Sequence, residues 1–291
     1  MREVTKAEFS AALKNLGIEN GQGLLVHSAV QFLGRPAGGV EMYYEALCEA
    51  LGISDQRLAI SDQLPEIQPE RSTFKLQPST GTLAVPTFTF AFARGEPYDP
   101  QETPSHGMGV FSEYVRRRPE ARRTPHPMQS LAVVGYWASD LADRDTPSAF
   151  DPGSAFERML ALDFKLLLLG ADIQAVSVLH YSEQRAQVPY RYWKEFQGPV
   201  RTPAGWQDRA YRMFVRDLEG GARIELYPVQ RLLEGRGQWH STLLNYGQIS
   251  LCRLSDFVAA VDQFLTQDPW SLVTNREEAL RGIENRARAI D

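Results

Sequence analysis

The 291-residue chain is poor in cysteine and has no long apolar run. Its two cysteines, Cys48 and Cys252, fall in a helical pattern and a strand pattern, which argues against a disulfide framework and favours buried reduced thiols. No run of about 18 apolar residues is present, so we expect no membrane-spanning helix. The first residues lack the apolar stretch of a signal peptide, and we therefore expect a cytoplasmic protein.

Positive charge is not in excess either. The chain has 31 Lys and Arg residues against 36 Asp and Glu residues, and its formal net charge is −5. A general nucleic-acid binder concentrates an excess of Lys and Arg, so we expect no nucleic-acid partner.

Two kinds of hydrolytic centre are also missing. The five histidines are scattered, and none stands beside another at zinc-ligand spacing, so we expect no metal site. The sequence has no G-x-S-x-G elbow, and Ser28 and Ser154 are better explained as turn or cap residues than as nucleophiles.

The most informative segment that is present places His180 three residues before Glu183. It follows Lys165 to Gly170, a short apolar run that predicts a core strand covered on both faces. If His180 to Gln187 form a helix, the imidazole and the carboxylate project side by side. The carboxylate then fixes the tautomer of the imidazole, and the other ring nitrogen can take a proton. Taken alone, such a pair is more often a solvated or capping pair than a catalytic one.

The remaining patterns predict an α/β fold. We expect a mixed, mainly parallel central sheet with helices on both faces and an antiparallel C-terminal extension, formed as one domain over residues 1–291. The extension is predicted as two alternating strands, Trp206 to Asp217 and Ala222 to Val229. An irregular segment at about 53–79 is too apolar for a free linker, and we expect it to cover the entrance of a substrate site or to form a subunit contact.

A glycine-rich stretch follows the first predicted strand, which ends at His27 and Ser28. Gly34, Gly38 and Gly39 would let the backbone approach a ligand and would leave amide groups free for a pyrophosphate at a helix N-terminus. The glycine pair is equally compatible with a simple turn before a helix. His27 is equally compatible with a core position, because strand alternation places it on the same face as Leu25.

Four segments occur in a fixed order: Val26 to Ala29, Gly81 to Thr89, Arg123 to Ser130, and Ser177 to Arg191. Together they resemble the aminoglycoside 3-N-acetyltransferase family of coenzyme A-dependent enzymes. The resemblance runs from about Gly21 to Tyr192, with a fainter echo from Asn245 to Leu265, and the chain after about residue 269 adds nothing to it. One departure is Val178, which stands where the family has a threonine.

The resemblance implies an acyl-CoA-dependent N-acyltransferase in which His180 is the general base and Glu183 orients it. Acetyl-CoA or another acyl-CoA is the implied donor. The implied donor-binding residues are His27, Ser28, Gly34, Gly38, Gly39, Thr87, Phe88, Thr89 and Ser177. The implied acceptor-binding residues are His126, Asp151 and Tyr190. The flanking prolines hold His126 extended, and from the residues alone a structural role is favoured for it.

The acceptor is expected to be a small-molecule amine. The region from Thr89 to Asp151 mixes acidic residues with many arginines, which does not predict a surface selective for polycations. We therefore expect N-acylation of an amino sugar or a related amine, with antibiotic resistance through aminoglycoside acetylation as the alternative. A catalytically inactive binding protein on the same fold is the alternative from another class. A homodimer is a further expectation.

Overall fold

The computed structural model describes residues 2–53, 80–217 and 221–290. The predicted insertion therefore lies, from residue 54 to residue 79, outside the described residues. The strands are β1 (Glu3–Val4), β2 (Gly23–Ser28), β3 (Arg35–Pro36), β4 (Thr82–Pro86), β5 (Arg122–Arg123), β6 (Leu131–Gly135), β7 (Lys165–Leu169), β8 (Tyr192–Thr202), β9 (Gly205–Val215), β10 (His240–Leu244) and β11 (Gly247–Arg253). The α-helices are α1 (Lys6–Asn15), α2 (Glu41–Leu51), α3 (Gly109–Arg116), α4 (Ala138–Ala142), α5 (Ala155–Ala161), α6 (Leu179–Ala186), α7 (Tyr227–Gly235), α8 (Leu254–Gln267) and α9 (Arg276–Ile290).

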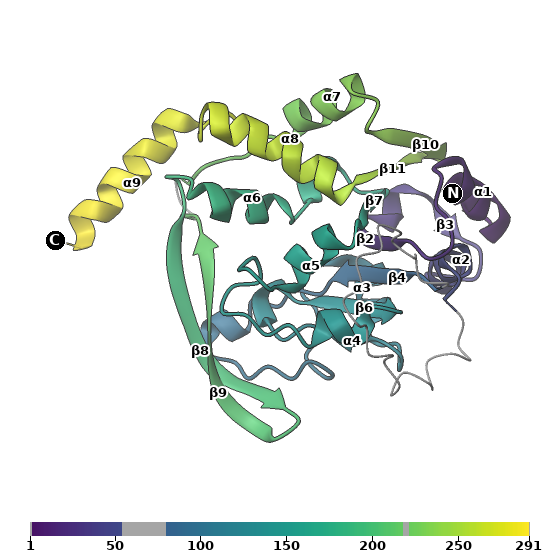
Figure 1. Ribbon diagram of the computed structural model, residues 1–291, viewed down its shortest axis with the longest axis horizontal. Coiled ribbons are helices and arrows are strands. Elements are labelled where there is room, and N and C mark those ends of the chain that lie inside the picture. The colour runs from purple at the N-terminus through teal and green to yellow at the C-terminus, as the bar shows by residue number, and fades with distance from the viewer. Residues whose placement is uncertain (1, 54–79, 218–220, 291) are drawn as a thin grey trace, which may run out of the picture.

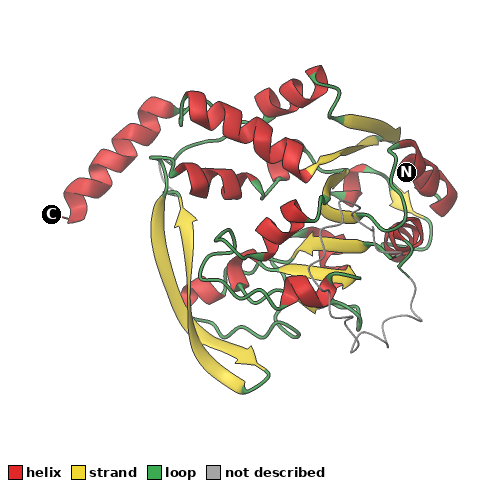
Figure 2. Cartoon of the chain, viewed as in Figure 1, coloured by secondary structure: helices red, strands yellow, loops and turns green. Residues whose placement is uncertain are grey.

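The central sheet has the strand order β10-β11-β7-β2-β4-β6-β5. Strands β7, β2 and β4 are parallel, whereas the pairs on either side of them are antiparallel. The mixed α/β class is thus confirmed, although parallel pairing is confined to the centre of the sheet and is less extensive than expected. Helices cover both faces (Figures 1 and 2).

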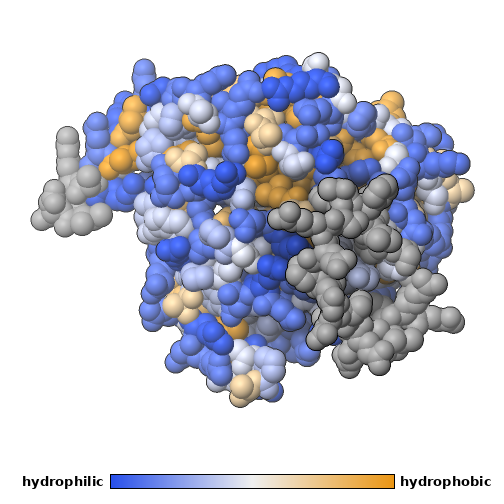
Figure 3. Space-filling view, in the orientation of Figure 1, coloured by the Kyte–Doolittle hydropathy of each residue, from blue (hydrophilic) through white to orange (hydrophobic). Residues whose placement is uncertain are grey.

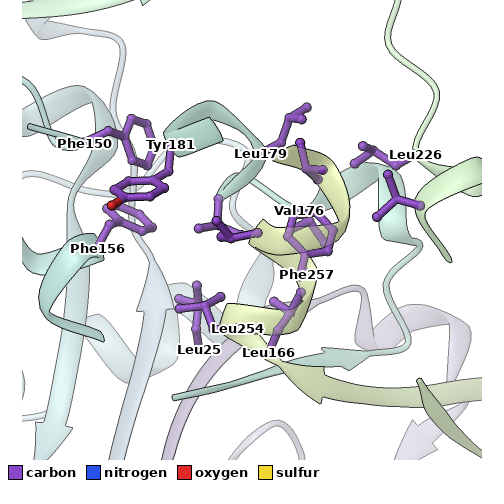
Figure 4. Close-up of a cluster of buried hydrophobic side chains, with 14 of the residues drawn as sticks. Leu25, Phe150, Phe156, Leu166, Val176, Leu179, Tyr181, Leu226, Leu254 and Phe257 are labelled. Carbon is purple, nitrogen blue, oxygen red and sulfur yellow. The ribbon is translucent and has the colours of Figure 1, made fainter. Parts of the chain in front are cut away.

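Alternation along the central strands builds two cores. Leu24 and Val26 of β2 join the cluster under α1, α2 and α3, whereas Leu25 points to the opposite cluster under α5, α6 and α8. In the second cluster, Leu254 and Phe257 of α8 approach Leu25 and Leu166 of the sheet (Figure 4). Because both faces are covered, the strands are continuous apolar runs, as the sequence predicted.

A long two-stranded ribbon stands apart from the sheet. Strands β8 and β9 pair along their whole length from Tyr192↔Val215 to Thr202↔Gly205 and curve along one side of the molecule (Figure 1). A small cluster that includes Tyr98, Val200 and Tyr211 lies beneath the ribbon. The Tyr98 amide donates to the Pro199 carbonyl at 2.9 Å, which anchors the ribbon to the body.

One predicted strand is wrong. Ala222 to Val229 does not pair with β9, whose partner is β8, and within it Ile224 makes only an isolated bridge to Val273. The segment instead leads into α7, which has a proline in its first turn, where the missing amide costs no hydrogen bond. Its apolar residues then follow helical spacing, with Val229 and Leu233 buried.

Other features agree with the sequence. Cys48 and Cys252 are both buried. Over the part of the chain that the structure describes, no helix is at once long and apolar enough to cross a membrane. The visible face is mostly hydrophilic, with its larger apolar patches in the upper half of the view around α6, α8 and α9 (Figure 3).

Candidate active site

Helix α6 brings His180 and Glu183 together as the sequence predicted. The helix spans Leu179–Ala186 and ends at Gln187, whose left-handed φ of 47° stops further winding. His180 Nδ1 lies 2.6 Å from Glu183 Oε2. A carboxylate only accepts, so a proton on Nδ1 lies between the two atoms and the other ring nitrogen, Nε2, is left as the acceptor.

Arg191 is a third member of this cluster. Its Nε lies 2.8 Å from Glu183 Oε2, and the Arg191 and Glu183 side chains are 8% and 0% exposed. Arg191 also approaches His180 Nδ1 at 3.2 Å and donates to the Phe214 carbonyl of β9 at 3.1 Å. Arg191 therefore ties the pair of His180 and Glu183 to the ribbon.

The charge of Glu183 depends on these two partners. Burial on its own would raise the pKa of Glu183, but the Arg191 charge and the hydrogen bond from His180 outweigh burial and hold the pKa below its ordinary value. The ionised carboxylate can then hold the imidazole. His180 itself remains accessible, with about a third of its side chain exposed (33%), and the Phe150 ring lies 6.2 Å from it.

His27 lies at the end of β2 beneath the start of α6. Its side chain is buried, and its Nε2 lies 3.5 Å from the Ser177 hydroxyl. Burial lowers the pKa of His27 to about 4, so the ring is neutral at neutral pH. Since the Ser177 carbonyl accepts from the His180 amide at 3.1 Å, the end of β2 is linked to His180 through Ser177.

The glycines after β2 divide into two groups. Gly38 and Gly39 have φ values of 87° and 82°, and a Cβ at either position would meet no atom within 4 Å. Gly34 is instead packed against Asn245, whose amide donates to the Leu33 carbonyl at 3.0 Å. The first two glycines present open backbone, whereas Gly34 has a packing reason to be glycine.

Thr87, Phe88 and Thr89 are all buried after β4. The Thr87 hydroxyl lies 3.1 Å from Arg123 Nε and 3.2 Å from the Ser130 hydroxyl. These hydrogen bonds join the segment Gly81 to Thr89 to the segment Arg123 to Ser130, and the Arg123 side chain is buried. The Thr87 hydroxyl, which was predicted to bind the donor, is therefore hydrogen-bonded within the protein.

A pocket of about 600 Å³ lies beside the end of β2, between the start of α2 and the helix α3. Its lining residues are Val40, Ser105, Gly107, Met108, Gly109, Val110, Glu113, Tyr114, Arg117 and Arg118. A Cβ on Gly109 would lie 3.4 Å from the Ser28 carbonyl, so the pocket adjoins the strand end that carries His27. Glu113 is paired with Arg116 and Arg117, which leaves the wall with more arginine than carboxylate.

The three predicted acceptor residues lie on the ribbon side of the site or beneath it. His126 is buried, its ring packs against Tyr211 at 5.0 Å, and its Nε2 lies 3.3 Å from the Arg212 carbonyl. Tyr190 is buried, and burial followed by the nearby Glu183 charge raises its pKa. Asp151 forms an ion pair with Arg212 at 3.1 Å.

Arg191 and Arg212 were not predicted as site residues. Arg191 appears in the sequence only as the end of a recognised segment, and Arg212 belongs to a strand pattern without other signal. Both reach the site through contacts between segments distant in sequence. Among residues 2–53, 80–217 and 221–290, no group of three or more His, Cys, Asp or Glu side chains is arranged to hold a metal ion.

Comparison with protein families gives a match to the model described as aminoglycoside 3-N-acetyltransferase over residues 25–266. An aminoglycoside N(3)-acetyltransferase III from Salmonella is 29% identical over 198 residues, which cover 67% of this chain and 66%, just under two thirds, of that relative. An aminoglycoside N(3)-acetyltransferase VII from Streptomyces paromomycinus is 29% identical over 232 residues, covering 75% of this chain and 73% of the relative.

Solved structures share the fold. A binary complex of AAC-IIIb with CoASH superposes with a TM-score of 0.73 at 21% identity, covering 91% of this chain and 97% of that one. A variant of aminoglycoside acetyltransferase AAC(3)-IVa in complex with apramycin superposes with a TM-score of 0.69 at 26% identity, covering 93% and 96% of the two chains.

Proposed function

This chain belongs to the aminoglycoside 3-N-acetyltransferase family, and on that premise we propose that it transfers an acyl group, most simply acetyl, from acyl-CoA to an amine of a small molecule. The observation that carries the proposal is the 2.6 Å contact from His180 to the buried Glu183, with His180 still accessible. A positioned imidazole of this kind is the group that an ammonium acceptor requires.

In the proposed reaction, His180 Nε2 accepts a proton from the acceptor ammonium and releases it to solvent. The neutral amine nitrogen forms a bond to the thioester carbonyl carbon, the bond from that carbon to sulfur breaks, and the second proton that the nitrogen loses as the amide forms passes to the leaving thiolate. Glu183 holds the imidazole by its Nδ1, and Arg191 holds Glu183. Positioning of the amine against the carbonyl supplies the remaining acceleration.

We place the donor in the pocket beside α3. The open backbone at Gly38 and Gly39 and the arginines of the pocket wall suit the phosphates of coenzyme A. From Gly109 the path continues past Ser28 and His27 to Ser177, and so to His180. The pantetheine arm would follow this path toward the base.

The proposed acceptor is an amino sugar or a related amine, the chemical class to which the aminoglycosides of its relatives belong. Antibiotic resistance through aminoglycoside acetylation is the second candidate, favoured by the names of those relatives. We further propose that the chain forms a single domain over residues 1–291, that it acts in the cytoplasm, and that it assembles as a homodimer.

The test is thiol release from acetyl-CoA in the presence of a panel of amino sugars and aminoglycosides, with the product identified by mass. We expect release with at least one amine and a loss of about two to four orders of magnitude in turnover for His180→Ala, the usual range for acid-base catalysis. Coenzyme A affinity should stay near the parent value. Turnover near the parent value in His180→Ala would refute the assignment of the base, and absence of release with every amine would favour a binding protein.

A further inference from the structure

The carboxylate on the acceptor side of the site is saturated. Asp151 is 12% exposed in its side chain. Its Oδ1 accepts from Gln184 Nε2 at 3.0 Å and from Arg212 at 3.2 Å, and its Oδ2 accepts from the Ser148 amide at 3.0 Å and from Arg212 at 3.1 Å. These four contacts use the acceptor positions that a carboxylate offers. An ammonium group could bind Asp151 only by displacing Arg212.

Arg212 is held where it can reach a bound acceptor. Strand alternation places it on the same face of β9 as Phe214, whose carbonyl accepts from Arg191. The Arg212 guanidinium lies 4.5 Å from the centre of the Trp193 ring, and 46% of the side chain is exposed. On the other side of the ion pair, Gln184 follows His180 by one helical turn and binds Asp151. Arg212 therefore connects to helix α6 through Asp151 and Gln184, while nearly half of its side chain stays exposed.

The two buried carboxylates nearest His180 in the contacts described above are each balanced by an arginine. Glu183 is paired with Arg191, and Asp151 is paired with Arg212. Glu195 lies opposite Arg212 in the ribbon register, and its exposed carboxylate accepts from the neutral amide of Gln197 at 2.8 Å, so it keeps its charge. Within the described part of the chain, Asp151 is the one carboxylate at ion-pair distance from Arg212. The two buried carboxylates are thus compensated, whereas Asp151 contacts Arg212 through Nη2 alone, so the half-exposed guanidinium keeps its other donors for an anion.

We propose that Arg212 selects the acceptor, and that the acceptor carries an oxyanion, either carboxylate or phosphate, in addition to its amine. This inference rests on the proposed N-acyltransferase function. A guanidinium presents donors in a planar fork that fits both oxyanions, and while Arg212 occupies Asp151 an ammonium group cannot bind that carboxylate. The amine is then turned toward His180 while the oxyanion is held at the ribbon. Arg212 is a specificity residue and takes no part in proton transfer.

The test compares four amines with the same acetyl-CoA: glucosamine, glucosamine 6-phosphate, muramic acid and apramycin. We expect glucosamine 6-phosphate, muramic acid or both to exceed glucosamine in kcat/KM by at least about tenfold, the range for a hydrogen bond to a charged group, with apramycin slowest. The phosphate and carboxylate acceptors distinguish the two oxyanions. Arg212→Gln should remove this preference chiefly through KM and should improve apramycin relative to glucosamine, whereas Arg212→Lys should keep part of the preference.

Arg209→Gln is the matched control. Arg209 lies on the same strand, its side chain is 43% exposed, and it also pairs with an aspartate, Asp145, at 3.7 Å. It should leave the order of acceptors unchanged. Calorimetric binding of the same four amines to the parent and to Arg212→Gln is measured in parallel, so that acceptor choice is tested even if no thiol is released.

The outcomes separate the two proposals. Thiol release that favours apramycin over both oxyanion-bearing amines would overturn the role of Arg212 and leave the N-acyltransferase function standing. An acceptor order that is the same in the parent and in Arg212→Gln would overturn it as well. Absence of thiol release with every amine, together with binding that favours an oxyanion only when Arg212 is present, would support the selection by Arg212 and refute the reaction.

Discussion

Replacement of Arg191 by methionine should destabilise the protein strongly. The Glu183 side chain is fully buried, and its Oε2 lies 2.8 Å from an arginine that is itself 8% exposed. Methionine keeps much of the volume of arginine but removes the charge, so Glu183 is left as a buried carboxylate without a cation. Breaking a buried pair in this way costs about 3–5 kcal/mol of the free energy of unfolding.

The same change should weaken catalysis through Glu183. Burial raises the pKa of a carboxyl group, and the Arg191 charge is the leading contribution that opposes burial here. Without Arg191 the pKa of Glu183 rises, and a protonated Glu183 holds the His180 imidazole less firmly. We expect a lower kcat with coenzyme A affinity unchanged, and partial recovery of kcat as the pH is raised and Glu183 ionises again.

Arg185→Met is the matched control on the same helix. Arg185 pairs with Asp262 at 3.2 Å, but its side chain is 55% exposed, and exposed pairs contribute about 0–1 kcal/mol. The free energy of unfolding is measured in urea for the parent, for Arg191→Met, for Arg185→Met and for the double variant Glu183→Gln with Arg191→Met. The double variant should be more stable than Arg191→Met, because it leaves no unpaired buried charge. If Arg191→Met and Arg185→Met lowered the free energy of unfolding by the same small amount, the buried pair of Glu183 and Arg191 would not stabilise the protein in the way argued.

Two further predictions concern the donor and the pH dependence of stability. Addition of coenzyme A should slow amide hydrogen exchange around Ser28, Gly38 and Gly109, and protection confined to the chain after residue 221 would contradict the proposed donor position. Burial lowers the pKa of both His27 and His126 to about 4 from an ordinary value of 6.5, so the unfolded chain binds more protons between these values and stability should fall as the pH drops from 6.5 toward 4. Each histidine contributes up to about 1.4 kcal/mol per pH unit to this slope in urea unfolding, and His27→Gln should reduce the slope, whereas an unchanged slope would show that His27 does not stay neutral in the folded protein.

Local patterns were sufficient to predict the centre of the fold and the contact between His180 and Glu183. The strand Lys165–Leu169 is visible in the sequence as an apolar run. His180 and Glu183 are three residues apart on one helix, so their spacing alone brings them together. Ser154 was also predicted correctly as a helix cap, since its hydroxyl accepts from the Glu157 amide at 3.3 Å.

Contacts across long sequence separations could not be predicted in the same way. Arg212 meets Asp151 across 61 residues, and this contact depends on the register of β8 with β9. The sequence between Ala222 and Val229 alternates like a strand, but the proline at the start of α7 and the helical spacing beyond it decide the outcome. One amino-acid sequence shows which segments favour strands but does not show which strands pair with each other.

The ribbon of β8 and β9 separates the evolution of acceptor choice from the evolution of chemistry. The base and the proposed donor path lie on α6 and on the sheet, whereas Arg212 and Trp193 belong to a hairpin that makes its own backbone pairs. If Arg212 selects the acceptor as proposed, exchanges at these two positions would alter which amine is admitted, while the apolar cluster beneath α6, to which neither residue belongs, would keep its packing. A lineage could therefore move between antibiotic and metabolic substrates by changing a few ribbon side chains, with the catalytic core inherited intact.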